Sequence, residues 1–508
     1  MSVASGPHTR FPGGSAAALR ETGDEVRFAA VRHEAPVSMW WHFALEGGGL
    51  PRRCVWEQTN EVLGWTQLPD AVPVYRGPGR PWRRVDPRSC HHDADRHEFR
   101  FTVPAVAGPV EVAYCYPFGL GEVAAWLAEL ERQAGVAVRV LTRSAGGRPF
   151  FLVEFGAGTR HVWLTARHHA GEVQGTWVMA GLIRAALASP RLLAAVTFHA
   201  APVMDVDGVA AGWYGKDRGP RDFNRDYVTR PCRPEVAALM AAAEAVGQAD
   251  VMLDLHGPAP GDPSFLVPPP EPTLSVEEWR TLWTFGARLQ ALAPRRCPVR
   301  VRDWSPSSLN WSGIHTGQTA TAWFHQRFGA LAATLETTYH RSHDERLVTA
   351  ADWLALGRSL AACLEVHCGL RPSPDTSAIA LPPTTLPRFR HWRCVTWPQR
   401  VTLREEGTRL TLHGDAAGGT AWMLSQRTQA GRRVAFRARL TGALGRLVVT
   451  ARGVDPRSGL STGTLRESRV PLRAAPATQH LTVPTPEAHS QLFFQAENLC
   501  GTLTLAVE

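Results

Sequence analysis

Lysine is almost absent from this 508-residue chain: Lys216 is the single example, and arginine supplies the other 54 of the 55 basic residues. Because arginine replaces lysine along the whole sequence, we attribute the net charge of +9 to composition rather than to nucleic-acid binding. No run of five or more basic residues occurs, which argues against a polybasic tail. We therefore expect no nucleic-acid partner, while an acidic substrate is compatible with the charge.

The sequence also lacks Cys-x-x-Cys pairs and long apolar runs. The nine cysteines are odd in number and form no Cys-x-x-Cys pair, so we expect neither a disulfide framework nor a thiolate zinc site. No apolar run reaches 18 residues, and residues 1–14 lack the apolar core of a signal peptide. These features predict a cytoplasmic protein without a membrane partner, and they say nothing about its oligomeric state.

Hydrophobic patterning divides the chain into four segments. Residues 1–118 alternate short strand-like runs with Gly/Pro clusters, which predicts an N-terminal β-sandwich domain. Residues 119–370 alternate strand-like and helical patterns, which is typical of an α/β domain with helices on both faces of a mostly parallel sheet. Residues 371–388, rich in Pro, Ser and Thr, predict a linker. Residues 389–508 return to β patterns and predict a β-sandwich or jelly-roll domain.

Within the α/β segment the elements can be placed by hydrophobic periodicity. Strands are expected at 149–155, 161–167, 195–204, 249–255 and 331–339. Helices are expected at 121–134, 173–188, 234–247, 276–293 and 350–367.

The first candidate site follows the strand-like run that ends at Arg167. His169 and Glu172 lie three positions apart at the start of a predicted helix, so both project from one face of its first turn. An imidazole and a carboxylate in this arrangement suit a divalent metal, above all zinc. Taken alone, such a pair is most often a solvated surface pair.

The second candidate site is the sequence Asp-Leu-His-Gly, with His256 at the end of another strand-like run. The carboxyl ends of parallel strands are where open α/β sheets bind ligands. Asp254 points to the same face, where it is placed to accept a proton from a metal-bound imidazole, although another neighbour is an equally good partner. Two histidines and one glutamate leave a fourth position for water, which is the catalytic kind of zinc site.

Two further groups carry polar chemistry. Asn224 and Arg225 lie in the polar segment 202–227, predicted as a loop, where an amide beside a forked guanidinium suits a carboxylate. Glu336 lies in a strand-like run, where a carboxylate is costly unless it is paired. Taken alone, Glu336 would be the partner of a buried arginine. Beside an open zinc site it would be a general base for a bound water.

The order of these motifs resembles the zinc metallocarboxypeptidases, in particular the cytosolic carboxypeptidases and their bacterial relatives. The resemblance rests on H-x-x-E, P-x-x-x-x-D-G-V with N-R, D-L-H-G and T-L-E, together with the segments SMWWHF and YCYPFGLG. It spans residues 38 to about 345. It implies an α/β fold with a doubly wound mixed sheet of the zinc carboxypeptidase type. It also implies a hydrolase that removes a C-terminal residue from a peptide or protein.

The resemblance also implies the metal chemistry. His169, Glu172 and His256 fall on the ligands of one zinc ion. Glu336 falls on the general base. Ala170 replaces the proline of the usual H-P-G-E form, a change expected only to loosen the turn.

For the substrate, the resemblance places Asn224 and Arg225 on the pair that grips the terminal carboxylate. The neighbouring Phe223 replaces the usual leucine of D-L-N-R. The family also places an arginine in this segment to stabilise the oxyanion. Lys216 and Arg218 are both candidates for that role, and we prefer Lys216.

Two other functions remain open from the sequence. A zinc amidohydrolase of the aspartoacylase or succinylglutamate desuccinylase type shares H-x-x-E, His and N-R motifs, and hydrolysis of acylated amino acids would identify it. A non-catalytic binding protein of the same fold is the other alternative, and the intact ligand set argues against it. The cytosolic branch often removes C-terminal glutamate, a preference with which a basic chain is compatible.

Overall fold

The computed structural model describes residues 6–269, 276–300 and 318–379, except 34, 47–48, 343–344 and 378, and the strands within 392–507. Residues 1–269, 278–304 and 319–379 form one compact unit, and residues 380–508 form most of a second. The boundary predicted after residue 118 lies inside the first unit. The predicted linker 371–388 falls mostly outside the described residues. No described helix combines the length and apolar character needed to cross a membrane.

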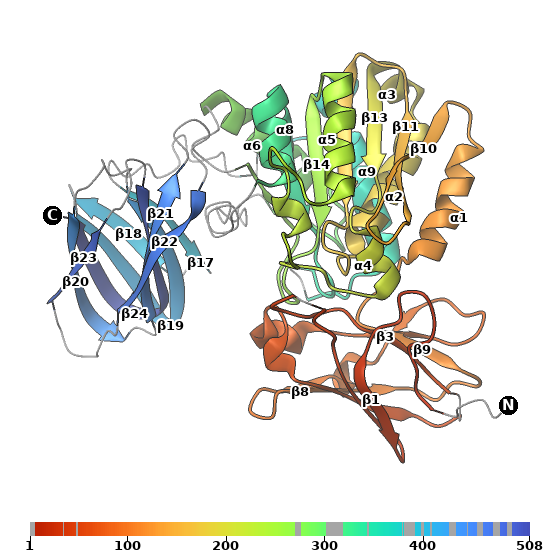
Figure 1. Ribbon diagram of the computed structural model, residues 1–508, viewed down its shortest axis with the longest axis horizontal. Coiled ribbons are helices and arrows are strands. Elements are labelled where there is room, and N and C mark those ends of the chain that lie inside the picture. Colours follow the sequence, from red (N-terminus) through yellow and green to blue (C-terminus); the bar gives the residue numbers. More distant parts are fainter. Residues whose placement is uncertain are drawn as a thin grey trace. The chain divides into compact units, whose positions relative to one another are not determined.

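Two sheets form the N-terminal part of the first unit (Figure 1). One has the order β1 (Ala17–Thr22), β2 (Glu25–Ala29), β4 (Arg52–Glu57), β8 (Glu98–Val103), β7 (His91–Asp93). The other has the order β3 (His42–Leu45), β9 (Val110–Ala113), β5 (Val74–Arg76), β6 (Arg83–Arg84). Aromatic side chains fill their interior: Trp41 stacks on Phe101 with ring centroids 5.7 Å apart, and both rings are buried.

A seven-stranded mixed sheet forms the centre of the unit. Its order is β10 (Val136–Arg143), β11 (Pro149–Phe155), β13 (Val196–Ala201), β12 (Arg160–Ala166), β14 (Val251–His256), β16 (Leu331–Glu336), β15 (Phe265–Val267). The four strands from β13 to β16 in this order are parallel, and the outer pairings are antiparallel. The mixed α/β fold expected from the sequence is therefore confirmed, with antiparallel strands confined to the two sides.

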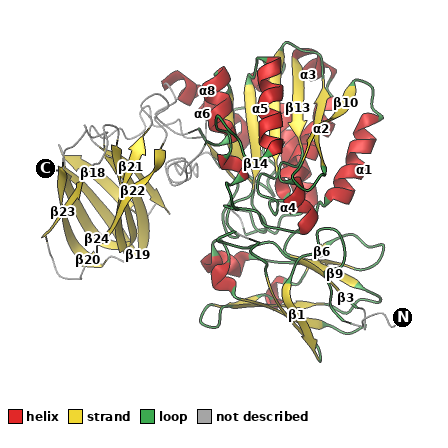
Figure 2. Cartoon of the chain, viewed as in Figure 1, coloured by secondary structure: helices red, strands yellow, loops and turns green. Residues whose placement is uncertain are grey.

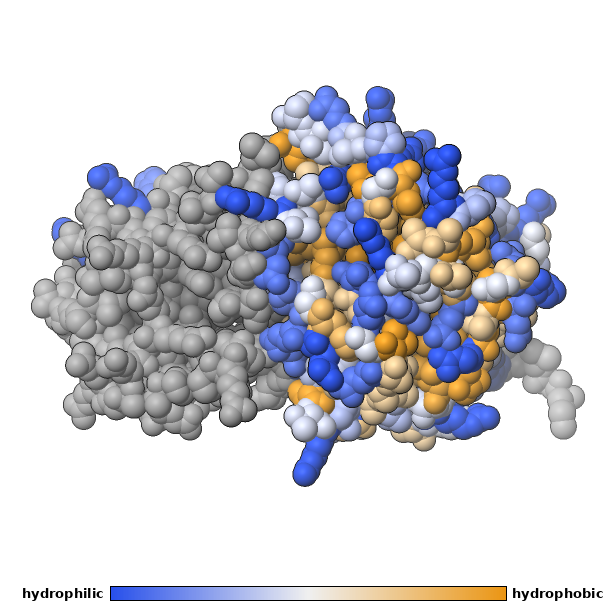
Figure 3. All heavy atoms as spheres, turned by 90° about the horizontal axis from the view of Figure 1, so that it is seen from above, coloured by the Kyte–Doolittle hydropathy of each residue, from blue (hydrophilic) through white to orange (hydrophobic). Residues whose placement is uncertain are grey.

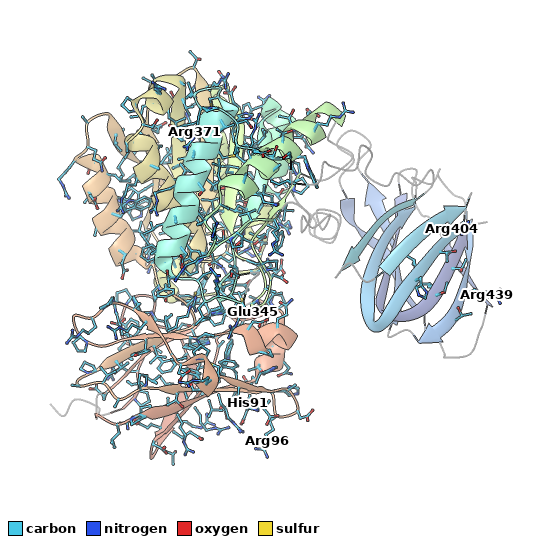
Figure 4. The ribbon with its side chains drawn as sticks, turned by 180° about the vertical axis from the view of Figure 1, so that it is seen from behind. His91, Arg96, Glu345, Arg371, Arg404 and Arg439 are labelled. Atoms are coloured by element: carbon cyan, nitrogen blue, oxygen red, sulfur yellow. The ribbon has the colours of Figure 1, made fainter. Side chains whose placement is uncertain are left out.

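Helices cover both faces of this sheet (Figure 2). The described helices of this part are α1 (Leu120–Glu131), α2 (Gln174–Leu187), α3 (Pro190–Ala195), α4 (Val206–Ala211), α5 (Pro234–Val246), α6 (Val276–Leu292), α8 (Ala320–Phe328) and α9 (Ala350–His367). Helix α5 lies on the near face in Figure 1, and α9 on the near face in the reverse view of Figure 4. Helices α2 and α9 pack so closely that a Cβ on Gly357 would lie 2.0 Å from the Val178 carbonyl oxygen.

The second unit contains an eight-stranded sheet built from β17 to β24. The strands are β17 (Trp392–Trp397), β18 (Val401–Glu406), β19 (Arg409–Ser425), β20 (Arg433–Ala443), β21 (Arg446–Val454), β22 (Ser461–Val470), β23 (Thr478–Pro484) and β24 (Ser490–Val507). Every pairing between these described strands is antiparallel. The β pattern expected for residues 389–508 is confirmed, whereas the sandwich or jelly-roll form stays a prediction.

The surface of the described residues mixes hydrophilic and hydrophobic side chains on the face shown in Figure 3. Of the large hydrophobic side chains in that part of the chain, Leu50 and Val140 are the most exposed, at 65% and 53%. Isolated apolar side chains of this kind are normal on a protein surface.

The N-terminal sheets and the α/β part meet at the loop that follows β14. Gln67 donates a hydrogen bond to Asp262 Oδ1 at 3.0 Å, which joins the short helix η2 (Trp65–Asp70) to that loop. Burial raises the pKa of Asp262 to about 6, against 3.8 for a free side chain. The contact therefore contains a carboxylate whose charge is poorly solvated.

This contact gives a pH-dependent stability prediction. Between about pH 4 and 6 the folded protein binds more protons than the unfolded chain, so the free energy of unfolding falls as the pH rises. Asparagine retains an acceptor for Gln67 without the charge. We expect Asp262→Asn to raise the free energy of unfolding by about 1–3 kcal/mol at pH 7.5 and to change it little at pH 4. Urea unfolding at the two pH values measures this, and an equal effect at both would contradict it.

Candidate metal centre

The predicted site residues meet at the carboxyl ends of three adjacent parallel strands. The segment from Arg167 to Glu172 follows β12, and His256 and Glu336 are the last residues of β14 and β16. The register of β14 and β16 pairs His256 directly with Glu336. Residues far apart in the sequence are thus brought to the edge of the sheet where α/β proteins bind ligands.

His169, Glu172 and His256 form a compact set of possible metal donors. Nδ1 of His169 lies 2.7 Å from Glu172 Oε1, and Nδ1 of His256 lies 2.6 Å from Glu172 Oε2. All three side chains are buried, and their donor atoms lie within 4.8 Å of one another. Two imidazoles and one carboxylate are a donor set suited to a catalytic zinc ion.

Two aspartates set the orientation of the imidazoles. Asp222 Oδ2 lies 3.1 Å from His169 Nε2, and Asp254 Oδ2 lies 2.8 Å from His256 Nε2. When each ring donates its Nε2 proton to an aspartate, Nδ1 carries a lone pair directed at Glu172. At these distances a ring nitrogen and a carboxylate oxygen share either a proton, which makes the ring an imidazolium, or a metal cation that lies among the donor atoms. The residues therefore fit a zinc ion.

Electrostatics in the metal-free protein agree with this geometry. Burial lowers the pKa of His256, but Asp254 and Glu172 outweigh it and raise that pKa well above its ordinary value. Burial also raises the pKa of Glu172, but His169 and His256 outweigh it and lower that pKa well below its ordinary value. Without a metal, positive charge is drawn to the place where the donor atoms converge.

Asp254 receives hydrogen bonds from four side chains, which belong to three segments of the chain. Thr165 Oγ1 and His168 Nδ1 bond to its Oδ1 at 2.7 and 2.8 Å. Asn224 Nδ2 and His256 Nε2 bond to its Oδ2 at 2.9 and 2.8 Å. With two donors on each oxygen, Asp254 is fixed in place, and it fixes His256 in turn.

His168, Asp254 and His256 form a second group with the spacing of metal ligands. The remaining ring nitrogen of His168, Nε2, lies 2.8 Å from the Tyr227 hydroxyl. Since the polar atoms of His168 and Asp254 are already hydrogen-bonded to protein groups, we assign this group to orienting His256 rather than to a second ion.

The turn that carries His169 depends on an unusual backbone conformation. Arg167 has φ of 61°, a left-handed conformation that costs a non-glycine residue about 1 kcal/mol. Its guanidinium donates to the carbonyl oxygens of Ala170 at 2.6 Å and Phe118 at 2.9 Å. A Cβ on Gly171 would lie 2.9 Å from Trp40 Cβ, so only glycine fits there. The turn expected to be loosened by Ala170 is thus held by an arginine side chain.

Glu336 is fully buried beside the donor set. Neither of its carboxylate oxygens has a hydrogen-bond partner among the described residues. Burial raises its pKa to about 7; the imidazole of His256 opposes the rise and the carboxylate of Glu172 adds to it. A carboxylate of this pKa can accept and return a proton near neutral pH.

The two oxyanion candidates have different surroundings. Lys216 Nζ lies 3.8 Å from Glu172 Oε1, which places its charge beside the donor set. Arg218 instead pairs with Asp205 at 3.1 and 3.2 Å, and its guanidinium lies 4.4 Å from the centre of the Trp213 ring. Of the two, Lys216 is the cation that lies beside the donor set.

Asn224 and Arg225 lie on the short helix η4 (Phe223–Arg225) and are buried. The Asn224 side chain donates to Asp254 and accepts a hydrogen bond from the backbone amide of Ala320 at 3.0 Å. Arg225 donates through one terminal nitrogen to the Asn224 carbonyl oxygen at 2.7 Å, and its Nε has no partner among the described residues. Of the two, Arg225 is the side chain with hydrogen-bonding capacity left for a ligand.

Some participants escaped the sequence analysis. Asp222 was not identified, although it stands two positions before Asn224 in a motif already singled out, and His168 had no role assigned. Tyr214 and Tyr339 are buried, and their hydroxyls have no hydrogen-bond partner in the described part of the chain. Burial, with Glu172 adding to its effect, raises the pKa of the Tyr214 phenol well above its ordinary value, so it stays a donor.

The sequence and the fold were compared with those of known proteins. Residues 123–234 match the sequence model of the zinc carboxypeptidase family. Among solved structures, a metallo-carboxypeptidase from Burkholderia cenocepacia shares the fold with a TM-score of 0.62 at 21% identity, over 71% of this chain and 98% of that one. A metallo-carboxypeptidase from Pseudomonas aeruginosa gives 0.62 at 22% identity, over 72% and 100%.

Among curated proteins, cytosolic carboxypeptidases are similar to part of this chain. Cytosolic carboxypeptidase 2 of Danio rerio is 31% identical over 172 residues, which is 29% of this chain and 23% of the relative. Cytosolic carboxypeptidase 6 of Caenorhabditis elegans is 26% identical over 38% of this chain and 46% of its own length. The chain thus spans less than half the length of these relatives. The resemblance inferred from the motifs is confirmed.

Proposed function

We propose that this protein is a zinc-dependent metallocarboxypeptidase that removes one residue from the C-terminus of a peptide or protein. The observation that carries the proposal is the convergence of two imidazole Nδ1 atoms and one carboxylate beside an unpaired, buried glutamate. The relatives named cytosolic carboxypeptidases support a cytoplasmic location. We also propose that the two N-terminal sheets, and the eight-stranded sheet of the second unit, form sandwich-type domains.

In this proposal His169, Glu172 and His256 hold one zinc ion. When bound, zinc lowers the pKa of a water molecule and polarises the scissile carbonyl. Glu336 accepts the proton of the attacking water and returns it to the leaving amine, a role supported by its burial beside the donor set with both carboxylate oxygens unpaired among the described residues. Lys216 stabilises the negative charge that develops on the carbonyl oxygen.

Arg225 gives the proposed enzyme its preference for chain ends. A guanidinium binds a terminal carboxylate through paired, charge-assisted hydrogen bonds that an internal peptide group cannot replace. For Asn224, its bonds to Asp254 and Ala320 support a role in positioning rather than in gripping the substrate. Glutamate remains the residue preference to test first, and faster cleavage of peptides that end in Leu or Phe would contradict it.

The function is tested with a library of peptides that differ at the last residue, with and without a zinc chelator. We expect one residue to be released from the C-terminus, and chelation to stop release until zinc is restored. Hydrolysis of acylated amino acids in place of peptides would instead identify the amidohydrolase alternative. Zinc binding without any hydrolysis would identify the binding-protein alternative.

The role of Arg225 makes a separate prediction. We expect Arg225→Ala to lower kcat/KM for a free-acid peptide by about 100- to 1000-fold, since a charge-assisted pair contributes about 3–4 kcal/mol when desolvated. The same peptide with a C-terminal amide should be a poor substrate for both proteins, so the variant should lose the discrimination between acid and amide. Arg221→Ala, in the same segment but paired with Asp226 at 2.6 Å, is the control. Equal discrimination in Arg225→Ala and the wild type would refute the assignment.

A further inference from the structure

Arg84 lies on β6 of the N-terminal sheets, but most of its hydrogen bonds go to the α/β part. Its Nε and one terminal nitrogen donate to the Val348 carbonyl oxygen at 3.0 and 2.8 Å. The same terminal nitrogen donates to the Tyr339 carbonyl oxygen at 2.7 Å. The other terminal nitrogen donates to His340 Nδ1 at 3.0 Å. One side chain thus binds both ends of the segment 339–348, which begins three residues after Glu336.

The segment meets the N-terminal sheets at their junction with the α/β part, where Figure 4 labels Glu345. His340 is buried, and its ring packs edge-on against Tyr114 with centroids 4.7 Å apart. Burial, and the nearby charge of Arg84, hold the pKa of His340 well below its ordinary value. The imidazole is therefore neutral, and its Nδ1 can accept a hydrogen bond from Arg84.

The backbone between Glu336 and Tyr339 is held step by step. The amide of Thr337 donates to the His256 carbonyl oxygen at 3.0 Å, and Gln174 donates to the Thr337 carbonyl oxygen at 2.9 Å. Trp353 donates to the Thr338 carbonyl oxygen at 3.1 Å. These bonds come from within the α/β part. Arg84 continues the series from outside it, with the Cys115 thiol as a second donor to Tyr339 at 3.3 Å.

The hydrogen bonds to this backbone matter because they help to set the position of Glu336. Its carboxylate accepts no hydrogen bond from the described residues, so its place relative to the metal donors depends on its backbone. We propose that Arg84 is a positioning residue that fixes the chain after β16 and thereby aims Glu336 at the reacting water. The proposal rests on the proposed carboxypeptidase function. It gives the N-terminal sheets an indirect part in the reaction, through the backbone that follows β16.

Chemical rescue tests the proposal. We compare the wild type with Arg84→Ala, Arg84→Lys and Arg83→Ala, the last being an exposed arginine at the preceding position of β6. We expect Arg84→Ala to lower kcat by about 10- to 100-fold with KM changed by less than about threefold, because misplacing a catalytic group by about 1 Å has effects of this size. Added guanidinium at about 20 mM should raise the kcat of Arg84→Ala about tenfold. Sodium chloride at the same concentration should not. Arg83→Ala should match the wild type.

Zinc content and thermal unfolding are measured on every variant. Arg84→Lys should retain zinc and fold but show most of the loss, because an ammonium cannot reproduce the planar fork of donors. Unchanged kcat in Arg84→Ala, or losses in both Arg84 variants that track lost zinc or lost folded protein, would overturn the proposal. An active wild type with an unimpaired Arg84→Ala rejects this inference alone. An inactive wild type rejects the proposed function and this inference with it.

Discussion

Glu336→Gln should abolish peptide hydrolysis while leaving zinc in place. Glutamine has nearly the same shape but cannot accept a proton, and general acid–base catalysis contributes about 100- to 10,000-fold. We expect kcat to fall by at least about 1000-fold, because the same carboxylate is proposed to serve twice, first for the water and then for the leaving amine. Steady-state kinetics on a cleaved peptide and metal analysis of the same sample measure the two effects.

The comparison with Glu235→Gln makes this result specific. Burial raises the pKa of Glu235 to about 7, like that of Glu336, but Glu235 lies at the start of α5 and outside the donor set. If Glu336 were only a buried structural residue, its replacement by glutamine would affect kcat no more than the same replacement of Glu235. We expect Glu235→Gln to retain wild-type kcat. Cleavage by Glu336→Gln at the wild-type rate would remove Glu336 as the base.

The free enzyme should also lose kcat/KM as Glu336 becomes protonated. Its pKa of about 7 applies to the protein without metal, and a bound cation would lower that pKa by favouring the charged form. The acid limb of the pH profile should therefore lie below pH 7 in the zinc enzyme and disappear in Glu336→Gln. The value of kcat/KM should fall at low pH because only the ionised carboxylate can accept a proton from the water.

The central fold could be predicted because its pattern is local. The apolar run 149–155 matches β11 (Pro149–Phe155), and the periodic pattern 350–367 matches α9 (Ala350–His367). Some elements were missed. Strand β10 (Val136–Arg143) was not predicted, although Val136, Val138 and Val140 alternate along it, and none of its residues is fully buried. Helix α4 (Val206–Ala211) lies in a segment expected to be a loop, because a six-residue helix capped by Asp205 is too short to show a period.

The candidate site was predictable only in part, for a different reason. His169, Glu172 and His256 each lie within a recognisable motif, so they could be predicted from the sequence as the donor set. The spacing of Asp254 and His256 on one strand suggested their contact, but the other contacts that orient the donor set join distant segments, which no spacing reveals. Asp254 also takes donors from segments around residues 165–168 and 224, and Arg84 reaches Tyr339 across 255 positions. The ion pair between Arg218 and Asp205 could not be foreseen from the sequence either, and the preference for Lys216 over Arg218 stays a prediction.

Of the substitutions considered, removal of a proposed zinc ligand should weaken zinc binding the most. Zinc binding in proteins is worth about 10–16 kcal/mol over a full set of ligands, so losing one should weaken binding by at least about 1000-fold. We expect His256→Ala to be purified without zinc and without peptidase activity. It should remain folded, because His256 lies at the end of β14 and its neighbours Leu253 and Leu255 keep the strand buried.

Asp254→Asn should give an intermediate result that separates orientation from ligation. Asparagine preserves the size of the side chain but removes the charge that holds the Nε2 proton of His256, and substitutions of such partners cost about 10- to 100-fold in metal affinity. Asp262→Asn, the same substitution at a contact away from the donor set, should bind zinc like the wild type. Competition with a calibrated chelator ranks the variants. If Asp254→Asn bound zinc as tightly as Asp262→Asn, the aspartate would have no part in holding the metal ligand, and the four-donor cluster would be purely structural.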